Sequence, residues 1–309
     1  MKVFVAGATG AIGRPLVRRL VAAGHEVTGT SRTPARAAEV AAAGATGVVC
    51  DALDPAGLTA AVTRAAPEVV INQLTSLPAK YEPRRKGFFT ANDRLRVEGG
   101  RNLIAAAAAA GARRMIAQSI AFLYAPIGDA VKVEEDPVAT GPGSAAALTL
   151  ERMTLEDGRF EPVVLRYGLL YGPGTWYAPE GHLGRQVAQR RLPLVGAATG
   201  IMSFVAVDDA AAATVAALER GRGIYNVVDD DPAPMSQWLP GFAAALKAPP
   251  PRRVPAWLAR LAVGRQVVDA ALNGRGASNS RARRELGWAP AHPSWRQGFA
   301  AAAAVPAVV

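Results

Sequence analysis

The stretch "KVFVAGATGAIG", residues 2–13, decides how the chain begins to fold. It opens with a largely apolar run of strand length, and the following "RPLVRRLVAAG" (14–24) has helical periodicity and ends in glycine. Gly7, Gly10 and Gly13 therefore stand in a turn between a predicted strand and a predicted helix. Glycine is needed where a backbone turns tightly and approaches a pyrophosphate, whose charge then meets the free N–H groups of the helix start. A purely structural turn also uses glycine, but the flanking strand and helix favour a dinucleotide site.

The same alternation continues along the first half of the chain. Further strands are predicted at "HEVTGTS" (25–31), "GVVC" (47–50), "PEVVIN" (67–72), "RRMIAQS" (113–119) and "EPVVLRYG" (161–168). Helices are predicted at "PARAAEVAAAG" (34–44), "DPAGLTAAVTRAA" (54–66), "RLRVEGGRNLIAAAAAAG" (94–111) and "LTLERMTLE" (148–156). Strands that are apolar on both faces and alternate with helices are typical of an α/β fold. We expect a Rossmann-like, doubly wound parallel sheet.

The rhythm changes near residue 172, where proline and glycine become frequent. Short strands "FVAV" (204–207) and "GIYNVV" (223–228) and helices over 208–219 and 235–247 are predicted there, and "APPPRRVP" (248–255) indicates a rigid connector. The expected organisation is a Rossmann domain over residues 1–171, to which later strands return. Residues 172–309 then form mainly a smaller, mostly helical substrate-binding lobe.

Composition excludes several classes of protein. The chain has 309 residues, is 50% hydrophobic and carries a net charge of +10, but its arginines are scattered and match no nucleic-acid module. Cys50 is the only cysteine and the three histidines lie far apart, so neither disulfides nor a metal site is expected. Apolar runs are too short to span a membrane and no leader is evident, which predicts a cytoplasmic protein. The expected partner is a small molecule, and the oligomeric state stays open, with a homodimer among the alternatives.

The end of the second predicted strand discriminates between cofactors. An NAD site usually has an acidic residue there, which binds the ribose 2′-hydroxyl. This chain instead has Ser31 and Arg32, followed one helical turn later by Arg36. Two guanidinium groups can hold a 2′-phosphate through charge-assisted hydrogen bonds, which favours NADP over NAD. The alternative is an ordinary exposed basic helix start.

With these features the chain resembles the extended short-chain dehydrogenase/reductase superfamily, of the NAD-dependent epimerase/dehydratase type. The matching segments are "GATGAIG" (7–13), "CDALD" (50–54), "RVEGGRNLIAAA" (96–107), "VVLRYGLLYGPG" (163–174), "FVAVDDAAAATVAAL" (204–218), "YNVVDD" (225–230) and "RRELGWAP" (283–290). They cover nearly the whole chain in the right order. The resemblance implies a cofactor site made by Gly7, Thr9, Gly10, Ala11, Ile12, Gly13, Ser31, Arg32, Arg36, Asp51, Ala52, Gln73, Leu74, Thr75, Asn92, Gln118, Tyr167, Gly168 and Leu169.

The superfamily's usual catalytic residues are missing. The resemblance implies a Ser or Thr, a Tyr and a Lys four residues after the Tyr, where the lysine lowers the pKa of the phenol and binds the nicotinamide ribose. None of the six tyrosines is followed by lysine at that spacing, and "GPGSAAALTLERM" (141–153) has alanines where the pair is expected. Counting back from Tyr124, the usual hydroxyl position is Ile120, so Ser119 stands one residue early. Ser119 and Tyr124 remain the candidate catalytic residues of an atypical member.

Substrate contacts are expected from Tyr81 and from the loop "TWYAPEGH" (175–182), which contains Trp176, Tyr177 and His182. Two classes of function stay open at this point. The first is an enzyme, an NADP-dependent oxidoreductase or epimerase that acts on a small carbonyl or sugar-derived molecule without the Tyr/Lys pair. The second is a non-catalytic NADP-binding redox sensor or scaffold. The aromatic loop favours the enzyme, because a sensor needs no substrate lobe.

Overall fold

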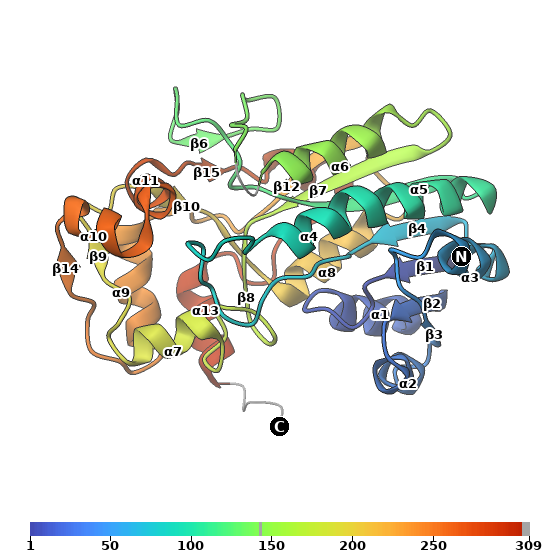
Figure 1. The fold of residues 1–309 in the computed structure, drawn as a ribbon, viewed down its shortest axis with the longest axis horizontal. Helices are drawn as coiled ribbons and strands as arrows, with labels where there is room; N and C mark the ends of the chain where they lie inside the picture. The colour runs from blue at the N-terminus through green and yellow to red at the C-terminus, as the bar shows by residue number, and fades with distance from the viewer. Residues whose placement is uncertain (142–143, 305–309) are drawn as a thin grey trace.

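The computed structural model describes residues 1–141 and 144–304, and its centre is a seven-stranded parallel sheet (Figure 1). The strand order across the sheet is β12 (Gly223–Val227), β7 (Glu161–Tyr167), β5 (Arg114–Ile120), β4 (Val69–Asn72), β1 (Lys2–Ala6), β2 (Glu26–Ser31) and β3 (Thr46–Val49). Chain order reverses direction between β1 and β4, and in such sheets a ligand binds beyond the carboxyl ends of the strands at this point. The prediction of a Rossmann-like fold is confirmed.

Helices cover both faces of the sheet, because its strands are apolar on both sides. One face packs against α1 (Gly13–Ala22), α2 (Pro34–Ala42), α8 (Val207–Ala216) and α12 (Ser280–Leu286). The other face packs against α3 (Pro55–Ala65), the continuous helix α4–η1–α5 (Thr90–Arg94, Leu95–Gly99 and Gly100–Ala109) and α6 (Ala145–Glu156). The middle segment η1 is a π-helical turn, a deviation that the regular periodicity of 94–111 did not predict.

A second core forms a smaller lobe beside the sheet (left side of Figure 1). Its helices are α7 (His182–Ala188), α9 (Met235–Ala245), α10 (Ala256–Val263), α11 (Arg265–Asn273) and α13 (Trp295–Ala304). Aromatic side chains, among them Phe204, Trp238 and Phe299, fill the lobe's interior with edge-to-face contacts. Four short strand pairs accompany these helices: β8 (Leu169–Tyr171) with β11 (Phe204–Ala206), β9 (Leu194–Val195) with β14 (Arg253–Val254), β10 (Ile201–Met202) with β13 (Ala233–Pro234), and β6 (Val131–Lys132) with β15 (Gly276–Ala277).

Two segments beyond residue 172 belong to the Rossmann layer. The strand predicted at 223–228 is β12, which pairs with β7 at the edge of the central sheet, and α8 packs against α1. The predicted connector 248–255 contains β14. Within the described residues, none of the helices has the length and apolar character to cross a membrane.

Candidate functional site

The glycine turn between β1 and α1 divides its three glycines between two roles. Gly7 has a φ of +87°, and a Cβ there would lie 2.5 Å from the carbonyl oxygen of Gln73. A Cβ on Gly13 would lie 2.2 Å from the carbonyl oxygen of Gly7, so both glycines are required by the backbone itself. A Cβ on Gly10 would meet only that same oxygen, at 3.4 Å. The packing of the described residues therefore does not require glycine at position 10. A glycine in such a place is expected where the backbone must leave room for a ligand.

The start of α1 offers unused hydrogen-bond donors. Within the described residues, the backbone N–H groups of Ala11 and Ile12 donate to no protein acceptor, and no side chain caps the helix. Thr9 is buried beneath the turn and its hydroxyl lies 3.5 Å from that of Ser31 at the end of β2. Free N–H groups at a helix start bind phosphate well, because the helix dipole adds to the hydrogen bonds.

Arg32 and Arg36 follow Ser31 on the exposed surface. Thr33 caps α2 by accepting from the backbone N–H of Arg36 at 3.4 Å, which places the two arginines around the first turn of that helix. Neither guanidinium forms an ion pair with a carboxylate of the described residues. Arg14, by contrast, already donates to Glu39. Arg32 and Arg36 are therefore available to an anion at the end of β2.

The ends of β3 and β4 supply the rest of the predicted cofactor surface. The Asp51 carboxylate accepts from the backbone N–H of Leu53 at 2.9 Å, and Asn102 donates to the carbonyl oxygen of Ala52 at 3.0 Å. Beyond β4, Leu74 and Thr75 are held from two sides. Gln118 donates to the carbonyl oxygen of Leu74 at 2.7 Å, and Asn92 accepts from the backbone N–H of Ser76 at 3.1 Å. Asn92 thus binds the backbone of the loop that follows β4.

Two buried polar atoms beside this segment have no hydrogen-bond partner among the residues that the structure describes. They are Nδ2 of Asn72, whose Oδ1 accepts from Leu74, and Oε1 of Gln73. A buried polar group that is left without a hydrogen bond is costly, and such groups commonly mark a place where water or a ligand binds. Both atoms lie at the carboxyl end of β4, at the point where the sheet reverses direction. Together with Gly10 and the open start of α1, they fit a dinucleotide.

The side chain of Tyr167, at the end of β7, points into the protein. Its phenol is fully buried, accepts from Nε2 of Gln73 at 3.0 Å and lies 2.7 Å from the hydroxyl of Thr214 in α8. Burial raises the pKa of Tyr167 to about 12. The next two residues are fixed by their backbones. The N–H of Gly168 donates to the carbonyl oxygen of Val227, and the N–H of Leu169 donates to that of Ser203. The Tyr167 side chain therefore supports Gln73 from below, and only the backbone of this segment is left for contact with a cofactor.

Ser119 and Tyr124 belong to one buried network with three residues that the sequence analysis missed. Ser119 donates its hydroxyl hydrogen to Oε1 of Glu151 at 2.5 Å. Glu151 also accepts two hydrogen bonds from Arg166, at 2.9 and 2.7 Å. Arg166 donates to the Tyr124 oxygen at 3.0 Å, and the Tyr124 hydroxyl donates to Asn226 at 2.7 Å. Both candidate hydroxyls thus have their only hydrogen engaged inside the protein.

The environment of these groups agrees with a structural role. Ser119 is 1% exposed and Tyr124 is 6% exposed. Burial raises the pKa of Tyr124, although the neighbouring Arg166 opposes the shift. The sequence did carry a signal for the missed pair: Glu151 lies on the buried face of α6, and Arg166 interrupts an otherwise apolar strand. Charged residues on a buried face require partners, which here are each other.

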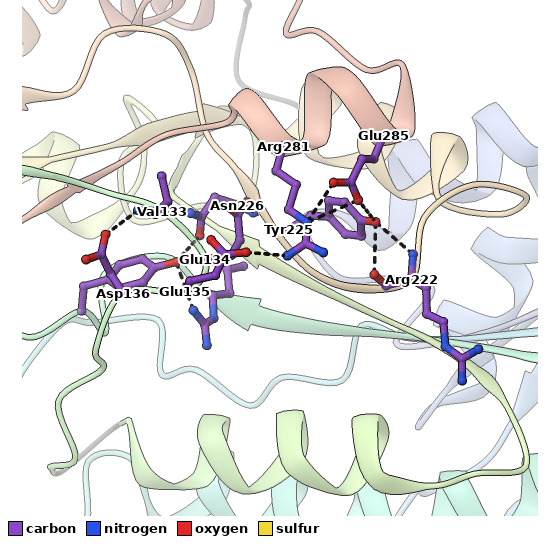
Figure 2. A network of polar contacts seen from close by, with 11 residues as sticks. Val133, Glu134, Glu135, Asp136, Arg222, Tyr225, Asn226, Arg281 and Glu285 are labelled. Atoms are coloured by element: carbon purple, nitrogen blue, oxygen red, sulfur yellow. Dashed lines mark hydrogen bonds and ion pairs between the residues drawn. The ribbon is translucent and has the colours of Figure 1, made fainter.

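Asn226 extends the network toward the surface (Figure 2). Its backbone N–H donates to Glu134 at 2.7 Å, and Glu135 pairs with Arg281 at 3.1 Å. Tyr225 donates to Glu285 at 2.7 Å. These contacts fasten the segment 131–138, which follows Tyr124, to β12 and α12. They hold the loop beyond β5 in one position.

Three of the four predicted substrate residues come together. The backbone N–H of Tyr81 donates to Nδ1 of His182 at 3.1 Å, and the rings of Tyr81 and Trp176 are 4.9 Å apart in an edge-to-face contact. Nε1 of Trp176 donates to the carbonyl oxygen of Pro78 at 2.8 Å. The loop after β4 is thereby joined to the loop 175–182. Tyr177 instead packs in the lobe core against Phe204 and Trp238, so its ring does not border an open site.

Large apolar side chains are exposed at the carboxyl edge of the sheet. Leu77 follows β4 and is 47% exposed, and Phe122 follows β5 and is 53% exposed. A cleft of about 680 Å³ lies beside α1 and α2. Its lining includes Thr9 and Ala11 of the glycine turn but none of the segments that end β2, β4 or β5. Among the described residues, no group of three or more His, Cys, Asp or Glu side chains could hold a metal ion.

Comparisons with known proteins identify the family and similar structures. The model of the NAD-dependent epimerase/dehydratase family matches residues 3–227. The chain is 47% identical to a Streptomyces 3-diazoavenalumate denitrifying reductase, over 97% of this chain and 99% of that protein. The UDP-glucose 4-epimerase of Thermotoga maritima with UDP-glucose superimposes with a TM-score of 0.79 at 18% identity, over 98% of this chain and 97% of that one. A human epimerase family protein with NADPH superimposes with a TM-score of 0.75 at 23% identity, over 98% and 99%.

Proposed function

Because this chain belongs to the NAD-dependent epimerase/dehydratase family, we propose that it is a nicotinamide-dependent reductase whose acceptor is an aryl diazo compound with an anionic group. The name of the Streptomyces relative, 3-diazoavenalumate denitrifying reductase, describes a reductase of a diazo acid anion. The observation that supports the proposal is the buried network, which engages the hydroxyls of both Ser119 and Tyr124. A reaction that needs no proton from the protein suits this arrangement.

The residues around the glycine turn would hold the cofactor, with NADPH preferred over NADH. The open N–H groups of Ala11 and Ile12 suit the pyrophosphate, and Gly10 leaves room for its approach. Arg32 and Arg36 suit a 2′-phosphate at the end of β2. When bound, the reduced cofactor supplies a hydride.

The proposed reaction balances without a protein acid. Hydride adds to the terminal nitrogen of the diazonium group and gives an aryl diazene. The diazene then gives up its N–H proton to solvent, its carbon–nitrogen bond breaks with release of N₂, and the ring carbon, which keeps the electron pair, takes a proton from solvent. A carbonyl acceptor, by contrast, becomes an alkoxide that must be protonated, which is the task of the tyrosine in the resembling superfamily. The role left to this chain is to position the acceptor beside the cofactor.

The side chains beyond the carboxyl ends of the strands suit an aromatic anion. The exposed Leu77 and Phe122 can bury an aromatic ring, and Tyr81 with Trp176 closes the side toward the lobe. The net charge of +10 attracts anions over a distance. The exposed side chains named here, Leu77 and Phe122, are apolar and do not suit the hydroxyl groups of a sugar.

The test is acceptor-dependent oxidation of NADPH under anaerobic conditions. We expect an aromatic carboxylic acid that carries a diazonium group to be reduced to the arene, with one NADPH consumed per N₂ released, and ketone analogues to be left unchanged. Gly10→Val, which should not bind the cofactor, controls for direct reduction by free NADPH. Binding of NADPH without oxidation by any diazo acceptor would favour the redox sensor or scaffold instead.

A further inference from the structure

Arg96 is a buried cation that the site described above does not use. It lies in the π-helical turn η1 and is 6% exposed. Its Nε is buried and has no hydrogen-bond partner, and its guanidinium donates to no side chain or carbonyl among the described residues. π-Helical turns inside α-helices are frequent at functional sites. A buried guanidinium with unused donors is a group that awaits an acceptor.

The hydrogen-bond acceptors near Arg96 do not bind its guanidinium group. Glu151 is close enough to influence the Arg96 charge, but its oxygens already accept from Ser119 and Arg166. Asp93 is also near, but among the described residues it forms no hydrogen bond or ion pair with Arg96. α6 packs against η1, and Ala147, one turn before Glu151, presents only a methyl group on its buried face. The unused donors therefore suit an acceptor from outside the chain.

The sheet order indicates which part of a ligand would lie there. Ser31 and Arg32, at the end of β2, mark the side of the adenine ribose. Glu151, which neighbours Arg96, binds Ser119 of β5 and Arg166 of β7, on the opposite side of the point where the sheet reverses. A dinucleotide that crosses this point places its second half on the β5 side.

We propose that Arg96 binds the ribose hydroxyls of the nicotinamide half of the cofactor. This inference rests on the cofactor site of the proposed function, but not on the diazo acceptor. Arg96 is then a cofactor-binding residue that reaches the site from η1. Asn92, one turn earlier, binds the backbone of the loop after β4.

The experiment compares the binding of whole NADPH with that of its adenine half, 2′,5′-ADP, by fluorescence and calorimetry. Arg96→Met should weaken NADPH binding by about tenfold or more, since charge-assisted hydrogen bonds are lost, and leave 2′,5′-ADP binding unchanged. Arg96→Lys, which keeps the charge and should fold even where the Met variant does not, should show an intermediate loss for NADPH alone. Arg101→Met removes an exposed arginine one turn later and should change neither affinity.

Unchanged NADPH affinity in the two Arg96 variants would overturn the inference. Equal losses for NADPH and 2′,5′-ADP would overturn it as well, because they would show a structural role. Failure of the proposed reaction is distinguishable, since these titrations contain no acceptor. A wild-type protein that binds NADPH but reduces no diazo compound would leave the Arg96 result standing.

Discussion

Ser119 donates its hydroxyl hydrogen to Glu151, a residue 32 positions later in the chain, at 2.5 Å. The same carboxylate binds Arg166, which in turn binds Tyr124. The two hydroxyls that the sequence offers for catalysis are therefore members of one buried ion-pair network. In this structure their hydroxyl hydrogens are donated within the fold, to Glu151 and to Asn226.

This network predicts that Tyr124→Phe lowers stability more than turnover. The variant leaves Oδ1 of Asn226 buried without its donor, which should cost about 1–3 kcal/mol of the free energy of unfolding. Ser119→Ala should behave similarly, because it removes one donor from Glu151. Denaturant unfolding and steady-state turnover of the two variants test this. A fall in turnover of tenfold or more at unchanged stability would instead identify the hydroxyl as a proton donor or an orienting group.

Cofactor preference should depend on Arg32. Arg32→Ala is expected to lose about 1.5–3 kcal/mol of NADPH affinity and little NADH affinity, because only NADPH has the 2′-phosphate. Arg14→Ala is the matched control, since that arginine lies nearby but pairs with Glu39. Titration with both cofactors gives the result. Equal wild-type affinity for NADPH and NADH would contradict the preference.

The three glycines of the turn should differ on substitution. Gly10→Val is expected to abolish dinucleotide binding in a folded protein, because a Cβ there meets little of the protein itself. Gly13→Val should lower the melting temperature markedly, since a Cβ there would lie 2.2 Å from the carbonyl oxygen of Gly7. Thermal unfolding and cofactor titration separate the two effects. Wild-type affinity in Gly10→Val would reduce the turn to a structural bend.

Asp229 should make stability depend on pH. Its carboxyl is 1% exposed, accepts from the backbone N–H of Trp295 at 2.7 Å, and has its pKa raised by burial to about 8. In the unfolded chain the same group ionises near the ordinary aspartate pKa of 3.8. The folded protein holds the extra proton between these values, so this contribution to stability is present at low pH and is lost as the pH rises from about 4 to about 8.

The variant Asp229→Asn removes this dependence. Relative to the variant, the wild type should lose up to about 1.4 kcal/mol of unfolding free energy per pH unit in that window. Glu156→Gln, an exposed carboxylate on α6, serves as the control and should follow the wild type. Chemical denaturation at pH 5, 6 and 7 measures the slopes. Parallel slopes for the wild type and Asp229→Asn would show that Asp229 is ionised in the folded state.

The sequence by itself determined the strand–turn–helix start, the alternation of buried strands and helices that predicts a parallel sheet, and the absence of a Tyr-x-x-x-Lys pair. These features are local, because a glycine turn and a hydrophobic period depend on residues within a few positions of each other. Only the tertiary structure decided where polar side chains point. Tyr124 donates to Asn226, 102 residues later, Tyr177 packs in the lobe core, and the Nε of Arg96 is buried without a hydrogen-bond partner among the described residues. The hydrogen-bond partner of a buried side chain is chosen by the packing of distant elements, which no local pattern encodes.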